Sequence, residues 1–228
     1  MIFAIIALIV ALLIYLPSFW VKRVMRTYSR EIPDMPGTGG ELAEHLINRF
    51  ELDGIGVEET DPYRDHFDPQ SKMVRLGPAN FNGKSLTAVA VAAHEVGHAI
   101  QFHRQEKIFD LRRRYLPTAQ FLANTGIAIM WALPLIAVLL RVPFAIGLVI
   151  GVSLLLQLAG AMAYLIILPE EWDASFNKAL PILIEGEYVE SEQLPAVRRV
   201  LQAAALTYFS AALANILHIG RWFMLLRR

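Results

Sequence analysis

Residues 118–168 read TAQFLANTGIAIMWALPLIAVLLRVPFAIGLVIGVSLLLQLAGAMAYLIIL, and Arg141 is the only charged residue among them. A helix needs about 20 apolar residues to cross a bilayer, so this stretch is too long for one span and long enough for two. Arg141 and Pro143 mark the connection between the two helices. The stretch therefore predicts a two-span transmembrane hairpin.

Two further apolar blocks lie at the ends of the chain. Residues 2–21 contain no charged side chain, and positive charges follow them rather than precede them, which is typical of a retained anchor and not of a cleaved signal peptide. Residues 1–21 are thus predicted to form an N-terminal transmembrane anchor. Residues 200–228 are a weaker block, interrupted by His218 and Arg221. Here we expect a C-terminal helix that forms a fourth span, the alternatives being a helix that lies on the surface or packs on the catalytic region.

The composition agrees with a mainly α-helical membrane protein. The chain is 55% hydrophobic and 18% charged, whereas average soluble domains are roughly 45–50% apolar and about 25% charged. Lys and Arg total 21 and Asp and Glu total 21, so no basic excess indicates a nucleic-acid partner. The chain has no cysteine, which excludes disulfides, Cys-ligated metal sites and thiol catalysis. The expected partner surface is the lipid bilayer.

Basic side chains gather on one side of the predicted spans. Four follow the N-terminal anchor: Lys22, Arg23, Arg26 and Arg30. Five precede the hairpin: Arg104, Lys107, Arg112, Arg113 and Arg114. The far side of the hairpin offers Arg141 alone. Because cytoplasmic loops carry an excess of Lys and Arg, residues 22–117 and 169–199 are predicted to face the cytoplasm, in the plasma (inner) membrane of a bacterium.

The early part of residues 22–117 is too polar for lipid, and the region is predicted to be a cytoplasmic catalytic region with a small β element. A one-sided apolar pattern predicts a helix over residues 37–50, bearing Leu42, Ala43, Leu46, Ile47 and Phe50 on its buried face. Short strands are expected near residues 55–58 and 73–76. An extended peptide could pair with an exposed edge of the second strand, or that strand could be an ordinary member of a sheet.

The motif His94-Glu95-Val96-Gly97-His98 lies in a proline-free stretch that predicts a helix over residues 85–105. Histidines four positions apart leave the same face of a helix and can bind one Zn²⁺. Glu95, next to the first histidine, can reach a water activated by the metal instead of the metal itself. As general base it would take the proton of that water and later deliver it to the leaving amine. The motif therefore predicts catalytic zinc.

A hydrolytic zinc site needs a third protein ligand. Residues 169–179 supply three candidate carboxylates: Glu170, Glu171 and Asp173. If a helix starts after Pro169, Glu171 is followed on its own face by Ala174 and Ser175, which makes that face narrow enough to approach Gly97. Ser175 could then accept a hydrogen bond from an imidazole N–H. Spacing favours Glu171 without excluding the other two, and an acidic helix start stabilised by the helix dipole is the simpler alternative.

Four segments carry a resemblance to a known family: SLTAVAVAAHEVGHAIQ (residues 85–101), HFDPQSKMVRLGPANFNGKS (66–85), EWDAS (171–175) and AAALTY (203–208). With the hairpin between them, the chain resembles the YugP-like membrane zinc metallopeptidases. It is more distantly similar to the HtpX heat-shock protease and the CAAX prenyl proteases, whose third zinc ligand is the Glu of an E-x-x-A-D motif. That resemblance implies Glu171 as the ligand, a zincin-like catalytic region and a gluzincin-type protease. Ser175 replaces the Asp that ends the motif, so this chain departs from the family pattern there.

Several expectations remain open from the sequence. Tyr208 could polarise the scissile carbonyl or belong to an aromatic belt at the membrane surface. Substrates are expected to be peptides or proteins, membrane proteins included, and a regulatory partner is left open. One alternative is a site-2-type intramembrane protease, although Asp53 precedes the HExxH motif where that family has its Asp after it. The other is a non-catalytic zinc-binding membrane scaffold, which would not need Glu95.

Overall fold

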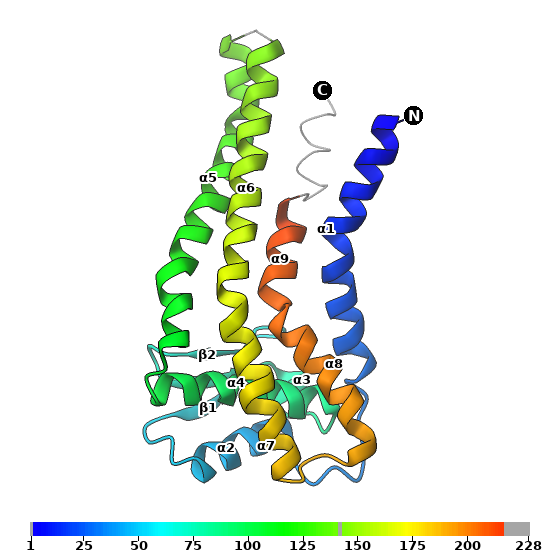
Figure 1. Cartoon of the computed structure of the whole chain (residues 1–228), viewed down its shortest axis with the longest axis vertical. Helices are drawn as coiled ribbons and strands as arrows, with labels where there is room; N and C mark the ends of the chain where they lie inside the picture. The colour runs from blue at the N-terminus through cyan, green and yellow to red at the C-terminus, as the bar shows by residue number, and fades with distance from the viewer. Residues whose placement is uncertain (1, 141–142, 217–228) are drawn as a thin grey trace. The chain divides into compact units, whose positions relative to one another are not determined.

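The computed structural model describes residues 2–140 and 143–216 (Figure 1). The chain divides into two compact units. The helical unit comprises residues 1–19, 111–168 and 207–228, and the mixed unit comprises residues 20–110 and 169–206. The prediction of a mainly helical chain with a small β element is confirmed.

Four helices contribute to the helical unit: α1 (Ile2–Thr27), α5 (Asp110–Leu140), α6 (Pro143–Trp172) and α9 (Thr207–Ile216). Among the described residues, two helical stretches are long and apolar enough to cross a membrane, namely Lys107–Ile136 and Phe144–Glu185. They cover residues 118–136 and 144–168 of the predicted hairpin. The predicted anchor is helical from Ile2 onward, and its role as a span stays a prediction. Residues 217–228, which complete the expected fourth span, lie outside the described residues.

The helices α5 and α6 run side by side (Figure 1) and pack closely through small and polar residues. A Cβ added at Gly126 would lie 2.6 Å from the carbonyl oxygen of Ser153, and one added at Gly160 would lie 2.8 Å from that of Ala119. The Ser153 hydroxyl donates to the carbonyl oxygen of Gly126 at 2.6 Å. Small residues that admit a close backbone approach, with an interhelical hydrogen bond, are typical of packed membrane helices.

This close contact predicts that an alanine substitution changes the melting temperature differently at two glycines of the hairpin. Gly126→Ala should lower the apparent melting temperature of the detergent-solubilised protein, because overpacking a close contact costs about 1–3 kcal/mol. Gly147→Ala is the matched control, since nothing lies within 4 Å of a Cβ at Gly147. The control should melt at or slightly above the wild-type temperature. Equal melting temperatures for the two variants would contradict the close packing.

The mixed unit contains a three-stranded sheet in the order β1-β3-β2, formed by β1 (Gly56–Glu59), β2 (His66–Asp68) and β3 (Met73–Leu76). Strand β1 pairs with β3 in parallel, with Gly56 opposite Met73, and β2 pairs with β3 antiparallel, with His66 opposite Arg75. The central strand is therefore β3. Of the two alternatives for residues 73–76, the structure supports an ordinary member of a sheet and not an exposed edge, because β1 and β2 pair with both sides of that strand.

Helices pack around this sheet in the mixed unit. The helix α2 (Gly39–Arg49) begins at a capping box, in which Thr38 accepts from the Glu41 N–H and Glu41 accepts from the Thr38 N–H. On its predicted apolar face Leu42, Ala43, Leu46 and Ile47 are buried and Phe50, at the C-cap, is half-buried, and the helix packs against α4 (Leu86–His103). The remaining helical elements are α3 (Pro78–Phe81), η1 (Lys107–Phe109), η2 (Asp173–Ala179), α7 (Leu180–Glu185), η3 (Ser191–Gln193) and α8 (Leu194–Ala205).

The expectation that a helix starts after Pro169 is wrong. Helix α6 continues through Pro169 to Trp172 and passes directly into η2, which is a π-helix. A proline removes one backbone donor, but packed membrane helices tolerate this loss when neighbouring groups satisfy the freed carbonyl. Because no helix begins at this point, a helix-dipole effect does not explain the acidic residues that follow Pro169.

Candidate metal centre

The HEVGH motif lies on α4, the most deeply buried helix of the mixed unit. Ser85 caps the helix by accepting a hydrogen bond from the Ala88 N–H at 3.1 Å. Every residue from Leu86 to Gln101 is buried, and small residues before the motif let α2, α8 and η2 pack directly on the helix. The motif is therefore held in rigid surroundings.

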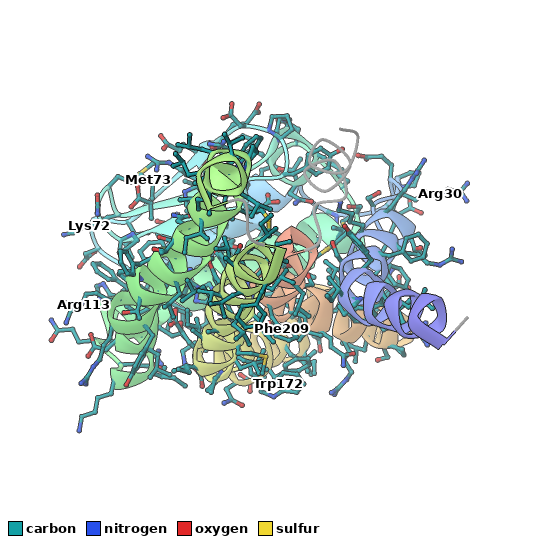
Figure 2. All side chains as sticks on the ribbon, turned by 90° about the horizontal axis from the view of Figure 1, so that it is seen from above. Arg30, Lys72, Met73, Arg113, Trp172 and Phe209 are labelled. Atoms are coloured by element: carbon teal, nitrogen blue, oxygen red, sulfur yellow. The ribbon has the colours of Figure 1, made fainter. Side chains whose placement is uncertain are left out.

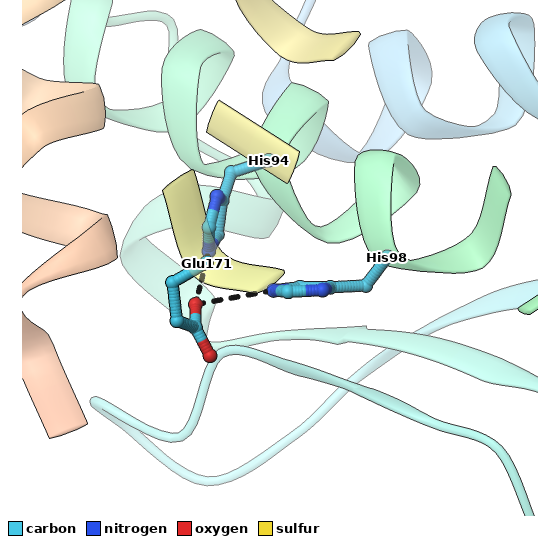
Figure 3. A group of neighbouring side chains, drawn as sticks. All are labelled: His94, His98 and Glu171. Atoms are coloured by element: carbon cyan, nitrogen blue, oxygen red, sulfur yellow. Dashed lines mark hydrogen bonds and ion pairs between the residues drawn. The ribbon is translucent and has the colours of Figure 1, made fainter. Parts of the chain in front are cut away.

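Three side chains converge within this core (Figure 3). The Oε2 atom of Glu171 lies 3.3 Å from Nε2 of His94 and 3.2 Å from Nε2 of His98. Candidate ligand atoms of the three residues all lie within 4.8 Å of one another. The side chains of His94, His98 and Glu171 are 4%, 1% and 2% exposed. Glu95, next to His94 on the same helix, is also buried.

His94 is oriented by Ser175, which lies on η2. The Ser175 hydroxyl lies 2.9 Å from Nδ1 of His94 and donates to the carbonyl oxygen of Leu201 at 3.1 Å. A serine has a single hydroxyl proton, so a proton given to Leu201 leaves the oxygen to accept from the His94 Nδ1–H. This assignment puts the lone pair of His94 on Nε2, facing Glu171.

His98 is oriented by Gln101, a residue for which the sequence predicts no role. The Oε1 atom of Gln101 lies 2.9 Å from Nδ1 of His98. Its amide nitrogen donates to the carbonyl oxygen of Glu170 at 3.0 Å and to Asp173 Oδ2 at 2.9 Å. Since the nitrogen faces two acceptors, the oxygen faces His98 and accepts its Nδ1–H. The available signal was the spacing, because a residue three positions after His98 shares its face of the helix.

These hydrogen bonds make the cluster suitable for zinc. Both imidazoles direct an Nε2 lone pair toward Oε2 of Glu171. Three electron-rich atoms therefore face one another in the buried core of the mixed unit. Burying a carboxylate without a compensating charge is costly, and a divalent cation supplies that charge. Two imidazoles and one carboxylate are also a donor set that catalytic zinc sites use, with a fourth position left for water or substrate. The residues therefore fit the metal.

The π-helix η2, which directly follows Glu171 and Trp172, comes very close to α4. A Cβ added at Gly97 would lie 2.7 Å from the carbonyl oxygen of Ala174, so only glycine permits this approach. Trp172 points outward (Figure 2) and is 44% exposed, whereas its neighbour Glu171 is buried. Adjacent helical side chains point about 100° apart, which explains the difference. The segment Asp173–Ala179 is a π-helix, a rare element that is frequent at functional sites.

The other candidate residues lie elsewhere. Glu170 Oε1 is 3.8 Å from Nδ1 of His98, behind the ring and not beside its Nε2. Asp173 contacts Gln101. Tyr208 belongs to the helical unit, where its ring stacks on Tyr164 with 6.4 Å between centroids and lies 5.0 Å from the Arg112 guanidinium. A role for Tyr208 in polarising a carbonyl stays a prediction.

Comparisons with known proteins agree with this chemistry. A protein family described as "Putative neutral zinc metallopeptidase" matches residues 3–227. The chain belongs to this family. It is 32% identical over 216 residues to "Putative membrane protease YugP" of Bacillus subtilis (strain 168), covering 91% of each chain. No solved structure matches the chain significantly. The predicted membership of the YugP-like family is confirmed, and zinc is the cofactor of this zinc metallopeptidase family.

The three carboxylates should differ in their effect on zinc content. Glu171→Ala should purify without zinc, because it removes the carboxylate that faces both Nε2 atoms. Glu170→Ala and Asp173→Ala should each retain one zinc ion per chain, since neither side chain reaches this point. Metal analysis of the purified variants beside wild type provides the measurement. Full zinc occupancy in Glu171→Ala, with loss in a neighbour, would overturn the assignment.

Proposed function

We propose that the protein is a zinc-dependent endopeptidase of the gluzincin type, with His94, His98 and Glu171 as the metal ligands. The observation that carries this proposal is the convergence of both Nε2 atoms on Glu171 Oε2, with Glu95 beside His94 on the same buried helix. Membership of a zinc metallopeptidase family supports it. The substrates of such an enzyme are peptides or proteins, and association with a membrane brings membrane proteins within reach.

Each residue has a distinct part in the proposed reaction. Zinc, when bound, lowers the pKa of a coordinated water toward neutrality and polarises the carbonyl that the water attacks. Glu95 acts first as general base, taking a proton from the attacking water, and then as general acid, passing that proton to the leaving amine. Ser175 and Gln101 hold the two imidazoles in the tautomer that offers Nε2 as the ligand atom.

The role of Glu95 can be separated from metal binding. Glu95→Gln should keep its zinc, because Glu95 is not a ligand, and should lose hydrolysis by at least about 10²-fold, the low end of the effect of a general base. Zinc content and peptidase activity are measured on the same preparation, with Glu44→Gln, on the exposed face of α2, as control. Zinc loss in Glu95→Gln would make Glu95 a ligand. Undiminished hydrolysis would remove it from the mechanism.

Two alternatives fit the structure less well. In a site-2-type protease the HExxH helix crosses the membrane. Within the part of the chain that the structure describes, α4 is not one of the two helical stretches that are long and apolar enough to do so. A zinc-binding scaffold needs the three ligands but gains nothing from a buried carboxylate such as Glu95 next to them. Loss of activity with zinc retained in Glu95→Gln separates the enzyme from the scaffold.

We further propose that the active site faces the cytoplasm of a bacterial cell. The proposal rests on the basic residues that flank the predicted spans at residues 1–21 and 118–168. With two crossings in the hairpin, residues 22–117 and 169–199 lie on the same side, as they must if Glu171 joins His94 and His98. A fourth span in residues 200–228 would not alter this arrangement.

The absence of native cysteines makes this topology directly testable. Single-cysteine variants Ser71→Cys and Glu190→Cys should react with a membrane-impermeant thiol reagent only after the cells are permeabilised. Arg141→Cys should react in intact cells. Labelling of residues 71 and 190 from opposite faces would contradict both the topology and the ligand set.

A further inference from the structure

A continuous line of polar side chains leads away from His98 on the side opposite Glu171. His98 Nδ1 contacts Gln101, whose amide nitrogen lies 2.9 Å from Asp173 Oδ2. The same carboxylate oxygen accepts a hydrogen bond from Nζ of Lys178. Lys178 also donates to Glu106 Oε2 at 2.8 Å. The line thus joins the C-terminal end of α4 to η2.

The side-chain amide of Gln101 can face His98 with its oxygen or its NH₂ group, and two neighbouring acceptors determine which of the two it is. With the amide reversed, its NH₂ group would point at Nδ1, and Nδ1 would have to accept. His98 would then carry its proton on Nε2 and could not offer that atom to a metal. The observed orientation pairs the NH₂ group with the Glu170 carbonyl and the Asp173 carboxylate. The carboxylate is the stronger of these acceptors, because hydrogen bonds to ionised groups are about twice as strong as neutral ones.

Asp173 is itself held in place from two sides. Lys178 binds Oδ2, the oxygen that faces Gln101, and the Lys178 side chain is only 10% exposed. Asn177 donates to the other oxygen, Oδ1, at 2.8 Å from an exposed position. A largely buried ammonium group holds the carboxylate in place at the oxygen that faces Gln101, whereas Asn177 adds a neutral contact at the far oxygen. Lys178 should therefore matter more than Asn177.

We propose that Asp173 and Lys178 are positioning residues of the metal centre, which act through Gln101 to set the tautomer and orientation of His98. This inference rests on the proposed zinc site. It also explains how the site can have Ser175 in place of the Asp that ends the E-x-x-A-D motif. Asp173 supplies a carboxylate that supports His98 through Gln101. His94 is supported by Ser175, whose hydroxyl donates to a backbone carbonyl oxygen.

Zinc affinity is the decisive measurement, made on the full-length protein in detergent by competition with a chelator. Asp173→Ala and Lys178→Met should each bind zinc about 10- to 100-fold more weakly, the range found when groups that orient metal ligands are lost. Both should still fill with zinc at saturation, unlike Glu171→Ala. Asn177→Ala is the matched control and should bind as wild type does. Wild-type affinity in Asp173→Ala and Lys178→Met would overturn the inference.

An exchange of side chains distinguishes positioning from general stability. Gln101→Glu alone places two carboxylates in contact and should weaken zinc binding by about 10-fold or more. Adding Asp173→Asn provides an NH₂ group to face the new carboxylate, which accepts the His98 Nδ1–H directly. The double variant should recover at least half of the lost affinity on a logarithmic scale. Additive losses would refute the proposed line of hydrogen bonds.

The melting temperature of the zinc-free protein completes the test. A purely structural role for Asp173 would lower this temperature without the recovery of zinc affinity in the double variant. If wild type itself binds no zinc, the proposed function fails. If wild type binds zinc, Glu171→Ala does not, and Asp173→Ala and Lys178→Met match wild type, only the positioning role fails.

Discussion

The backbone contact between Gly97 and Ala174 sets the geometry on which the metal centre depends. A Cβ at Gly97 would lie 2.7 Å from the Ala174 carbonyl oxygen, so the two segments approach more closely than a side chain at position 97 would allow. Glu171 and Ser175 lie on either side of that contact in sequence, and both reach the histidines of α4 from there. A wider separation would leave a glutamate too short to face both imidazoles. The glycine in HEVGH is thus a requirement of packing as well as a part of the motif.

The close approach also buries several polar groups, and hydrogen bonding compensates for that cost. Buried polar atoms without partners are destabilising by about 1–3 kcal/mol each. Ser175 and Gln101 each accept a hydrogen bond from a histidine Nδ1–H and donate one to a backbone carbonyl oxygen. Because each hydrogen bond fixes the direction of the next, the protein selects one tautomer for each imidazole. The two histidines are therefore oriented by the requirement that the buried donors and acceptors around them form hydrogen bonds.

The sequence predicted the elements whose pattern is local. The apolar face of α2, the capped helix α4 and the long apolar hairpin all follow from periodicity or length. Two features of the fold were not predicted, because local sequence patterns do not determine them. Strand β2 has only three residues, His66–Asp68, and exists through pairing with β3. Helix α6 continues through Pro169 to Trp172, against the local preference of proline.

The site shows the same division between local and distant information. Spacing placed His94, Glu95 and His98 on one helix, and the small residues after Glu171 favoured it over its neighbours. Gln101 was visible as a residue on the face of His98, but its role depends on Asp173 and on the backbone of Glu170, which lie about 70 positions away in the chain. The carbonyl oxygen of Leu201 is a similar case, since it takes the hydroxyl proton of Ser175. Because Val197, Val200 and Leu201 are fully buried, the packing of α8 fixes that oxygen and so contributes to the orientation of His94.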